Sequence, residues 1–379
     1  MSEIELIATT TFGLEAVVKR ELQNLNYNDL VVENGKVTFK GEERDIPRAN
    51  LWLRSADRVL LKMGEFKATT FEELFEKTKT LPWEEWITLD GEFTVTGKAV
   101  DSQLMSVPDC QAIVKKAVVE KLKTKYNTEW FQETGAKFTI QVSLLKDIAT
   151  LTIDTSGEGL HKRGYRENSV EAPIKETLAA ALVNLSFWNH ERILVDPFCG
   201  SGTIPIEAAM IGKNIAPGIQ RSFASEEWPR VKKEYWKEER INARKAIIQD
   251  RELRIYASDI DGEAIEIAKE NAFNAGVDDC IEFSIGDVLK FRTNEEYGVI
   301  ISNPPYGERI GEKNQVEKLY IEIGKKFRQL DTWSIYIITS NENFEYLYGK
   351  KADKRRKLFN GRIKVDYYQY YGPRPPRKE

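Results

Sequence analysis

The segment 302–307, Ser-Asn-Pro-Pro-Tyr-Gly, combines groups that suit chemistry on an amine. Two consecutive prolines fix φ and remove two N–H donors, so the carbonyls of the turn can point outward as free acceptors. Asn303 adds a side-chain carbonyl. The exocyclic amine of a base is a poor nucleophile, because its lone pair is delocalised into the ring. If Asn303 and the Pro304 carbonyl accept both hydrogens of that amine, a pyramidal nitrogen with an available lone pair is favoured.

The aromatic residue of this segment adds a second function. Tyr306 can stack on a base that has been turned out of its helix. Taken alone, the segment is also typical of a plain Pro-Pro turn. It follows an apolar strand predicted over 299–302, the fourth parallel strand after residue 174, and at that place a binding site for a base is the stronger interpretation.

A glycine-containing turn at 195–203, Val-Asp-Pro-Phe-Cys-Gly-Ser-Gly-Thr, joins a predicted strand to a predicted helix. Gly200 and Gly202 let the backbone turn tightly and approach a ligand without a Cβ in the way. The amides of the helix N-terminus then face that ligand. The turn lacks the third glycine of a dinucleotide fingerprint and the Lys-Ser/Thr of a P-loop, which argues against most nucleotide-phosphate binders.

Two further acids end the next two predicted strands. Asp259 can accept both ribose hydroxyls of an adenosine-like cofactor, and Asp287 can accept its adenine amino group. Because the carboxyl ends of parallel strands form one crevice, we expect both to converge with Asp196. Asp259 considered alone is equally typical of a helix N-cap.

The elements that must position these residues form a doubly wound pattern from residue 174 onward. Helical and apolar strand segments alternate there, which predicts a parallel sheet. Lys213 to Asp250 is long for one connection and is interpreted as an insertion. The Asn360-Gly361 pair between alternating residues predicts a terminal hairpin turning at those two positions. The predicted strands cover 193–196, 254–258, 281–285, 299–302 and 334–339, and the helices 176–185, 206–211 and 262–274.

The region before residue 174 has a different pattern. Residues 1–65 alternate in a β-α-β-β-α-β order of ferredoxin-like type. Residues 66–155 form a second small unit that ends in a hairpin turning at Lys146-Asp147. A charged, glycine-containing linker covers 156–173, and the doubly wound domain covers 174–379.

Composition excludes several classes of protein. The 379 residues are 41% hydrophobic and 31% charged, which is typical of a globular chain, and no apolar run approaches the ~20 residues of a membrane span. The acidic start does not resemble a signal peptide, so we expect a cytoplasmic protein. Three separated cysteines argue against disulfides, and two histidines without neighbouring ligands argue against a metal site.

The net charge of −4 argues mildly against nucleic acid as a partner, but the charge is uneven. A basic stretch lies where the two halves meet, and it could clamp an RNA phosphate. The alternative is a structural linker with surface charges. The residues of this stretch that we predict to contact RNA are His161, Lys162, Arg163, Tyr165 and Arg166.

Four segments together resemble the ordered motifs of class I methyltransferases with an Asn-Pro-Pro-Tyr site: 196–203, 258–261, 286–287 and 303–306. Segments 160–166 and 172–179 further resemble the bacterial THUMP-containing RNA guanine-N2 methyltransferases of the RlmL/YpsC type. The resemblance implies an α/β fold, with a Rossmann-like methyltransferase domain whose parallel sheet ends in an antiparallel hairpin. It also implies an α+β ferredoxin-like and THUMP region ahead of that domain.

The resemblance further implies S-adenosylmethionine as cofactor and a guanine of 23S ribosomal RNA as substrate. Some members carry a second methyltransferase domain, and we expect one active site in this chain. The implied cofactor contacts are Asp196, Phe198, Gly200, Gly202, Thr203, Asp259, Ile260, Asp287 and Asn303. The implied base contacts are Asn303, Pro304, Pro305 and Tyr306.

Other functions remain open at this point. The same amine chemistry would serve guanine N2 in tRNA, adenine N6 in DNA or RNA, or a glutamine amide of a protein, although the THUMP-like half argues against a protein substrate. A non-catalytic RNA-binding assembly factor is a further alternative, but it has no need of the complete set of three acids and Asn303. No residue stands out as the acceptor of the amine proton, and either an aspartate or water could take it.

Overall fold

The computed structural model describes residues 3–166, 173–307 and 313–376. The chain divides into two compact units. Unit 1 contains residues 1–10, 18–160 and 222–242, and unit 2 contains residues 11–17, 161–221 and 243–379. Residues 11–17 of unit 2 therefore interrupt the sequence of unit 1, and residues 222–242 of unit 1 interrupt the sequence of unit 2. Within the described residues, no helix combines the length and apolar character needed to cross a membrane.

Unit 1 begins with the β-α-β-β-α-β order that the sequence predicts. The residue pattern located five of these six elements one by one and did not locate the strand β2. Strand β1 pairs with β3 on one side and with β4 on the other, and its consecutive residues Leu6, Ile7 and Ala8 are all buried. The elements are β1 (Ile4–Thr9), α1 (Glu15–Asn24), β2 (Leu30–Glu33), β3 (Lys36–Gly41), α2 (Asp45–Trp52) and β4 (Arg58–Lys67).

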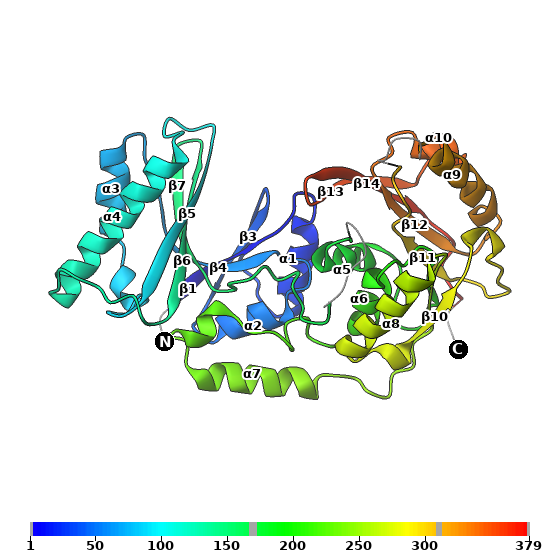
Figure 1. The fold of residues 1–379 in the computed structure, drawn as a ribbon, viewed down its shortest axis with the longest axis horizontal. Coiled ribbons are helices and arrows are strands. Elements are labelled where there is room, and N and C mark those ends of the chain that lie inside the picture. Colours follow the sequence, from blue (N-terminus) through cyan, green and yellow to red (C-terminus); the bar gives the residue numbers. More distant parts are fainter. Residues whose placement is uncertain (1–2, 167–172, 308–312, 377–379) are drawn as a thin grey trace. The chain divides into compact units, whose positions relative to one another are not determined.

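The second part of unit 1 extends the same sheet. Strand β7 pairs antiparallel with β4, so seven strands run in the order β2-β3-β1-β4-β7-β6-β5. The predicted hairpin at Lys146-Asp147 is confirmed, and helices α3 and α4 cover one face of its strands (Figure 1). The elements are α3 (Phe71–Lys79), η1 (Trp83–Glu85), β5 (Glu92–Val100), α4 (Val107–Tyr126), β6 (Lys137–Leu145) and β7 (Ile148–Asp154).

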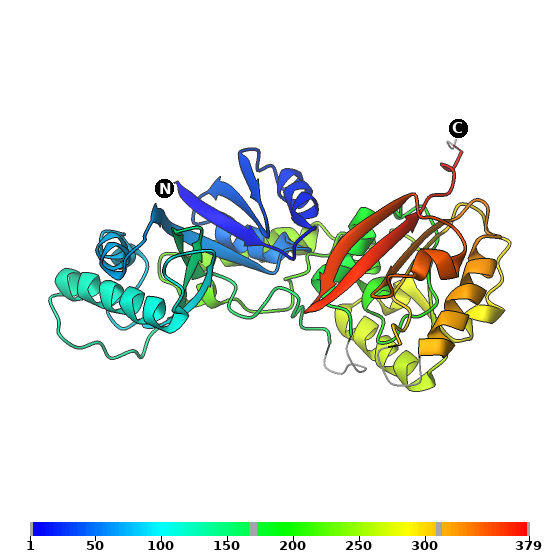
Figure 2. The ribbon, with the colours of Figure 1, turned by 90° about the horizontal axis from the view of Figure 1, so that it is seen from above.

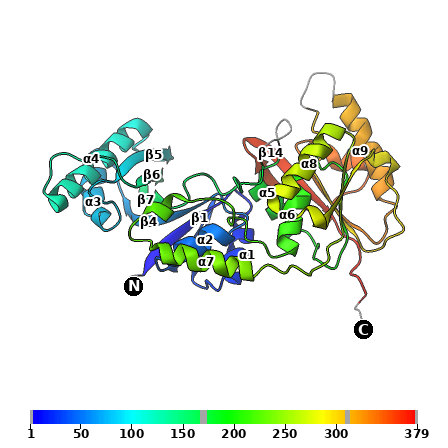
Figure 3. The same ribbon diagram turned by 60° about the horizontal axis from the view of Figure 1, so that its bottom comes forward.

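The predicted insertion has an unexpected location. Its residues 222–242 pack in unit 1, although the sequence on both sides of them belongs to unit 2. The segment contains the short η2 (Ala224–Glu227) and most of α7 (Lys233–Lys245), which lies along α2 (Figures 1 and 3). The Trp228 ring stacks on Phe138 at 4.9 Å, and its Nε1 donates to the Lys137 carbonyl at 3.1 Å. The insertion thus completes the core of unit 1.

Unit 2 contains the predicted parallel sheet with a terminal hairpin. The strand order is β10-β9-β8-β11-β12-β14-β13, and the first five strands are parallel while β14 runs antiparallel to β12. The order reverses beside β8, and in doubly wound sheets such a point forms a ligand crevice. The strands are β8 (Leu194–Asp196), β9 (Ile255–Asp259), β10 (Ile281–Ile285), β11 (Val299–Ser302), β12 (Ser334–Thr339), β13 (Lys354–Asn360) and β14 (Ile363–Tyr370).

Helices cover both faces of this sheet (Figure 3). Alternate residues of one strand point to opposite faces, so Ile301 and Ile300 belong to two different hydrophobic clusters. One cluster contains α5 (Glu176–Leu185), α6 (Thr203–Gly212) and α8 (Gly262–Ala275), and the other contains α9 (Lys313–Phe327) and α10 (Phe344–Tyr348). Two short 3₁₀ turns complete the unit: η3 (Asp278–Cys280) and η4 (Val288–Lys290).

The terminal hairpin is confirmed, but the predicted position of its turn is wrong by one residue. Asn360 pairs with Ile363, so the turn residues are Gly361 and Arg362, and Gly361 has φ +63°. The register explains this difference, because Leu358 pairs with Val365 and both are fully buried. A shift by one residue would expose them. Asn360 is therefore the last residue of β13, at the tip of the long hairpin that is drawn in red in Figure 2.

Candidate active site

The three predicted acids converge in unit 2. Asp196 ends β8, Asp259 ends β9 and Asp287 follows β10, and all three line one cavity of about 690 Å³. That volume lies within the range of small-molecule sites, roughly 300–1,000 Å³. The other predicted residues that line it are Phe198, Gly200, Thr203, Ile260, Asn303, Pro304, Pro305 and Tyr306.

The two glycines of the 195–203 turn have different functions. Gly200 has φ +51° and lines the cavity, and its N–H donates to Oδ2 of Asp259 at 2.9 Å. Gly202 has φ +81° and does not line the cavity. A Cβ on Gly202 would lie 3.1 Å from the Cβ of Ala268, so this glycine allows α6 to approach α8. Its contribution to a cofactor site is therefore the shape of the turn.

The acids at the ends of β9 and β10 retain acceptor capacity. Asp259 accepts one backbone N–H on each oxygen, from Gly200 and from Asp261, the second at 3.1 Å. A carboxylate oxygen can accept more than one hydrogen bond, so ribose hydroxyls can still bind there. Oδ1 of Asp287 accepts the Leu289 N–H at 2.9 Å, and within the described residues its other oxygen has no partner.

Asp196 is 1% exposed and belongs to the interior of unit 2. Its Oδ1 accepts from Ser302 Oγ at 2.7 Å and from the Phe198 N–H at 3.2 Å. Burial raises the pKa of Asp196 to about 7, and the nearby Asp259 carboxylate acts in the same direction. Ser302 was not predicted as a site residue, because its partner lies 106 residues earlier in the chain.

A buried tyrosine that the sequence did not indicate anchors the Asn-Pro-Pro-Tyr turn. The hydroxyl of Tyr320 on α9 donates to the Pro305 carbonyl at 2.7 Å and also bonds Thr339 Oγ1 at 2.8 Å. Burial raises the pKa of Tyr320 to about 12, so this hydroxyl keeps its proton. The Pro304 carbonyl has no partner among the described residues and remains an acceptor. Tyr320 was missed because it belongs to the apolar side of a helix, where a tyrosine gives no local signal.

The side chains of Asn303 and Tyr306 contact each other. The Tyr306 hydroxyl donates to Oδ1 of Asn303 at 2.6 Å. Around them the cavity is completed by Leu319 of α9 and by Asn360 and Ile363 of the hairpin. The hairpin therefore contributes residues to the cavity as well as to the fold.

Two residues of the predicted RNA-contacting stretch, Arg163 and Tyr165, are buried in the interior of unit 2. Arg163 is 3% exposed, and its Nε bonds Oε1 of the fully buried Glu207 at 3.2 Å. The buried Tyr165 donates to the same oxygen at 3.3 Å. These two side chains are used within the protein, because a buried charge requires a partner. We therefore do not retain Arg163 and Tyr165 as RNA contacts.

Arg166 bonds two residues that line the larger cavity. Its Nη2 donates to Thr203 Oγ1 at 2.5 Å and to the Ile174 carbonyl at 3.2 Å, and both partners line the cavity. Within the stretch, the exposed Lys162 and the half-buried His161 remain available to a partner. Burial and then the neighbouring cations lower the pKa of His161 to about 4, so it is neutral near pH 7.

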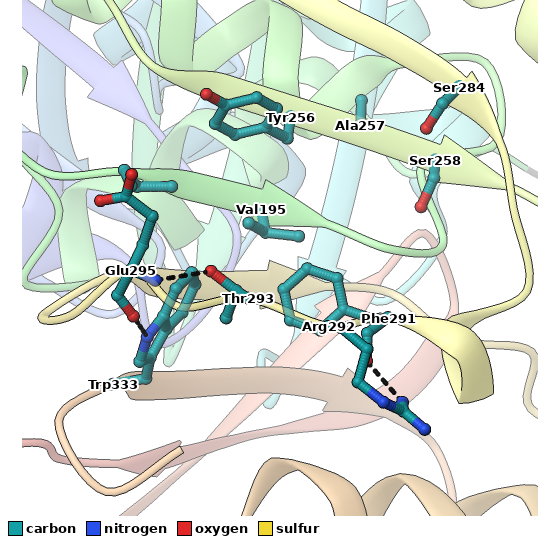
Figure 4. Close-up of a pocket in the computed structure, with 11 residues that line it drawn as sticks. Val195, Tyr256, Ala257, Ser258, Ser284, Phe291, Arg292, Thr293, Glu295 and Trp333 are labelled. Carbon is teal, nitrogen blue, oxygen red and sulfur yellow. Dashed lines mark hydrogen bonds between the residues drawn. The ribbon is translucent and has the colours of Figure 1, made fainter.

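A second cavity of about 240 Å³ lies over the sheet in unit 2, between β8–β10 and the segment 291–295 (Figure 4). Trp333 Nε1 donates to the Glu295 carbonyl at 2.8 Å, and the Glu295 N–H bonds Thr293 Oγ1 at 3.0 Å. These bonds brace the segment that connects β10 to β11. None of the predicted site residues lines this cavity, so the candidate chemistry belongs to the larger one.

The larger cavity suits S-adenosylmethionine. Its carboxylates complement the sulfonium and ammonium charges of that cofactor, and the turn at Gly200 leaves room for close backbone approach. Asp259 and Asp287 have acceptors for a ribose and for an adenine amino group. No group of three His, Cys, Asp or Glu side chains that could hold a metal occurs in the described part of the chain.

Comparison with known proteins supports this assignment. Residues 163–369 match the family model described as "RMKL-like, methyltransferase domain". Residues 5–60 match the RlmL ferredoxin-like domain, and residues 68–154 match the THUMP domain. The fold of each region agrees with these matches.

Two curated proteins are similar along nearly the whole chain. The "Putative RNA methyltransferase YpsC" of Bacillus subtilis (strain 168) is 56% identical over 382 residues, which covers 100% of this chain and 99% of that protein. The "Ribosomal RNA large subunit methyltransferase K/L" of Psychromonas ingrahamii is 36% identical over 380 residues, which covers 98% of this chain and 50% of that protein. The chain thus spans about half the length of the second relative.

A solved structure agrees in fold and in ligand chemistry. It is described as "SMU.472, a putative methyltransferase complexed with SAH", with a TM-score of 0.93 and 48% identity over 99% of this chain and 100% of that one. S-adenosylmethionine is therefore the cofactor of this protein. The chain belongs to the RMKL-like methyltransferase family, with an RlmL-type ferredoxin-like domain and a THUMP domain ahead of its methyltransferase domain.

Proposed function

We propose that the protein methylates the exocyclic N2 amine of a guanine in RNA, and that this RNA is 23S ribosomal RNA. One observation carries the proposal: Asn303 and Pro304, which bring two hydrogen-bond acceptors to the end of β11, line the same cavity as Asp196, Asp259 and Asp287, the three acids that we propose bind the cofactor. An amine with two hydrogens matches that pair of acceptors.

The residues of the turn have distinct tasks in this mechanism. S-adenosylmethionine, when bound, supplies an electrophilic methyl group. Asn303 and the Pro304 carbonyl accept the two amine hydrogens and so localise the nitrogen lone pair. Tyr320 occupies the Pro305 carbonyl and holds the turn in one conformation. The Tyr306 ring offers a stacking surface to the base, a contact worth about 1–3 kcal/mol per base.

The proposed RNA substrate rests on the regions ahead of the methyltransferase domain and on the relatives. The THUMP match at 68–154 supports an RNA partner, and the relative from Psychromonas ingrahamii is named for the large-subunit ribosomal RNA. Structured RNA is recognised mainly by shape and by backbone contacts. A net charge of −4 is compatible with that mode if the basic residues are unevenly distributed.

The test is methyl transfer from labelled S-adenosylmethionine to total RNA of a strain that lacks the gene, followed by nucleoside analysis. We expect N2-methylguanosine in 23S RNA with the wild type, and none with Asn303→Ala. Asn294→Ala, at an exposed position that lines neither described cavity, is the matched control and should retain activity.

Three other results of this experiment would point to a different substrate or a different role. Labelled N2-methylguanosine in the tRNA fraction would retain the chemistry and change the substrate. Labelled N6-methyladenosine would show that the acceptor pair serves adenine. Absence of label from every RNA fraction, with cofactor binding intact, would reject an RNA methyltransferase and favour a binding role.

A further inference from the structure

We infer that the hydroxyl of Tyr306 is a positioning group: it selects the orientation of the Asn303 carboxamide in which Oδ1, and not Nδ2, faces the substrate amine. The inference rests on the proposed function, because it concerns the side chain proposed to accept a hydrogen of the target amine. It assigns the hydroxyl a task that is separate from stacking by the ring.

The orientation of this carboxamide matters because its two ends have opposite hydrogen-bonding character. Oδ1 accepts hydrogen bonds and Nδ2 donates them, yet the two ends have nearly the same size. Rotation by 180° about χ2 would present an NH₂ group to an amine, and two donors would then face each other. Packing alone discriminates poorly between the two orientations, so a hydrogen-bond partner must choose.

The backbone around Asn303 is already fixed. The hydroxyl of the preceding Ser302 donates to Oδ1 of Asp196 at 2.7 Å, and the hydroxyl of Tyr320 donates to the Pro305 carbonyl at 2.7 Å. Neither contact acts on the Asn303 carboxamide, which is only half-buried. These bonds determine where Asn303 lies and leave its χ2 free.

Tyr306 supplies the missing constraint. Its hydroxyl donates to Oδ1 of Asn303 at 2.6 Å, and this is the one side-chain hydrogen bond of Asn303 in the described part of the chain. A donated hydrogen needs an acceptor, so this contact favours Oδ1 over Nδ2 at the position that faces the hydroxyl. Both side chains line the cavity, so an oxygen directed at Tyr306 lies on the side where a stacked base would be.

The contact also leaves Asn303 able to act. A carbonyl oxygen has two lone pairs, so it can accept from the Tyr306 hydroxyl and from the amine at the same time. A neutral hydrogen bond of this kind biases an equilibrium by about 3- to 10-fold. The expected contribution of the hydroxyl to the rate is therefore of that size.

The first test is Tyr306→Phe, which keeps the ring and removes the hydroxyl. We expect kcat to fall by about 3- to 10-fold, while KM for RNA, the Kd for S-adenosylmethionine and the melting temperature stay unchanged. Tyr306→Leu removes the ring as well and should also raise KM for RNA. Tyr346→Phe is the matched control, since Tyr346 is 87% exposed on α10.

A double-mutant cycle tests the mechanism itself. Asn303→Asp places acceptor oxygens at both ends of the side chain, so its orientation no longer matters. If the Tyr306 hydroxyl acts by orienting the carboxamide, Tyr306→Phe should lower kcat in the wild-type background and have no further effect with Asn303→Asp. An equal loss in both backgrounds would overturn the inference.

Two other results would also overturn it. An unchanged or increased kcat in Tyr306→Phe would mean that the hydroxyl is dispensable or that it blocks Asn303. A lower kcat accompanied by equal losses in melting temperature and cofactor affinity would mean that the hydroxyl only supports the fold.

A measurement without substrate separates this inference from the proposed function. The side-chain amide signal of Asn303 in a ¹⁵N NMR spectrum can be assigned by its loss in Asn303→Ala. We expect one pair of peaks at a single ¹⁵N shift in the wild type and a shifted or doubled pair in Tyr306→Phe. An unchanged signal would reject the inference even if the enzyme methylates guanine, and a changed signal would support it even if the substrate is another amine.

Discussion

Oγ of Ser302 donates a 2.7 Å hydrogen bond to Oδ1 of Asp196 and so joins the last residue of β11 to the last residue of β8. The acid is 1% exposed, and its pKa is raised to about 7 by burial. The two strands that carry the cofactor turn and the Asn-Pro-Pro-Tyr turn are thus tied together through a carboxyl group that titrates near neutral pH.

This relationship predicts a pH-dependent effect of Asp196→Asn on stability. The carboxyl binds a proton more tightly in the folded chain than in the unfolded chain. Its contribution to stability is therefore complete below about pH 4 and is lost as the pH rises through 7. Asparagine cannot ionise. The free energy of unfolding of the variant should therefore exceed that of the wild type by on the order of 2–4 kcal/mol at pH 8 and by little at pH 4. Urea denaturation at both pH values measures this difference.

The same variant should bind S-adenosylmethionine more weakly at pH 8, because it lacks the carboxylate. Asp250→Asn, at an exposed position, is the matched control and should change neither stability nor binding. A stability difference between wild type and Asp196→Asn that is equal at both pH values would show that Asp196 titrates in its ordinary acidic range.

The buried pair of Arg163 and Glu207 gives a second prediction. Glu207→Ala would leave the guanidinium buried without its carboxylate, which should lower the free energy of unfolding by about 3–5 kcal/mol. Lys162 directly precedes Arg163 and is exposed, so Lys162→Ala should have no measurable effect on stability. Denaturation of both variants tests whether the stretch is structural at Arg163.

The exposed Lys162 is tested by RNA binding, whereas the buried Arg163 is tested by stability. If Lys162 contacts a phosphate, Lys162→Ala should weaken RNA binding and reduce the salt slope by about 1. Equal stability of Glu207→Ala and wild type would contradict the structural assignment of Arg163.

The sequence predicted the convergence of Asp196, Asp259 and Asp287 because their chemistry is encoded locally. Each acid lies at the carboxyl end of a strand or within two residues of it, and parallel strands bring their carboxyl ends to one edge. The glycine turn and the Pro-Pro turn are likewise short-range features. For such residues, knowledge of the fold class was sufficient to locate the cavity.

The remaining features depend on long-range contacts. The bond of Tyr320 to the Pro305 carbonyl spans 15 residues, and that of Arg163 to Glu207 spans 44. A run of basic residues does not reveal whether a buried acid lies far along the chain. The turn of the hairpin was misplaced for a related reason, because burial of Leu358 fixes the register more strongly than the preference of an Asn-Gly pair.

The corrected register leads to a third prediction. Asn360 ends β13 and lines the cavity with Ile363, and within the described residues its carboxamide has no partner. A free carboxamide can bond the edge of a base. Asn360→Ala should therefore raise KM for RNA by about 3- to 10-fold and leave cofactor affinity unchanged. Steady-state kinetics with Asn294→Ala as control test it, and a loss of cofactor affinity instead would assign Asn360 to the cofactor side.

The last prediction concerns the insertion that packs in unit 1. The Trp228 indole is 1% exposed, stacks on Phe138 and contacts the edge of Trp86 at a centroid distance of 6.2 Å. Trp228→Ala would leave a cavity that the sheet cannot close, which should lower the free energy of unfolding by about 3–5 kcal/mol. Hydrogen exchange should show the loss of protection in β6, while S-adenosylmethionine still binds in unit 2.

Trp130→Ala is the matched control, because Trp130 is 82% exposed and its removal leaves no buried cavity. Arg230 supports the same site, since its guanidinium lies 4.3 Å from the Trp86 ring centroid and bonds Glu43 at 3.1 Å. If Trp228→Ala and Trp130→Ala have equal effects, residues 222–242 only cover the surface of unit 1. A selective loss in Trp228→Ala would mean that unit 1, which contains the THUMP domain, depends for its stability on a segment of the methyltransferase sequence.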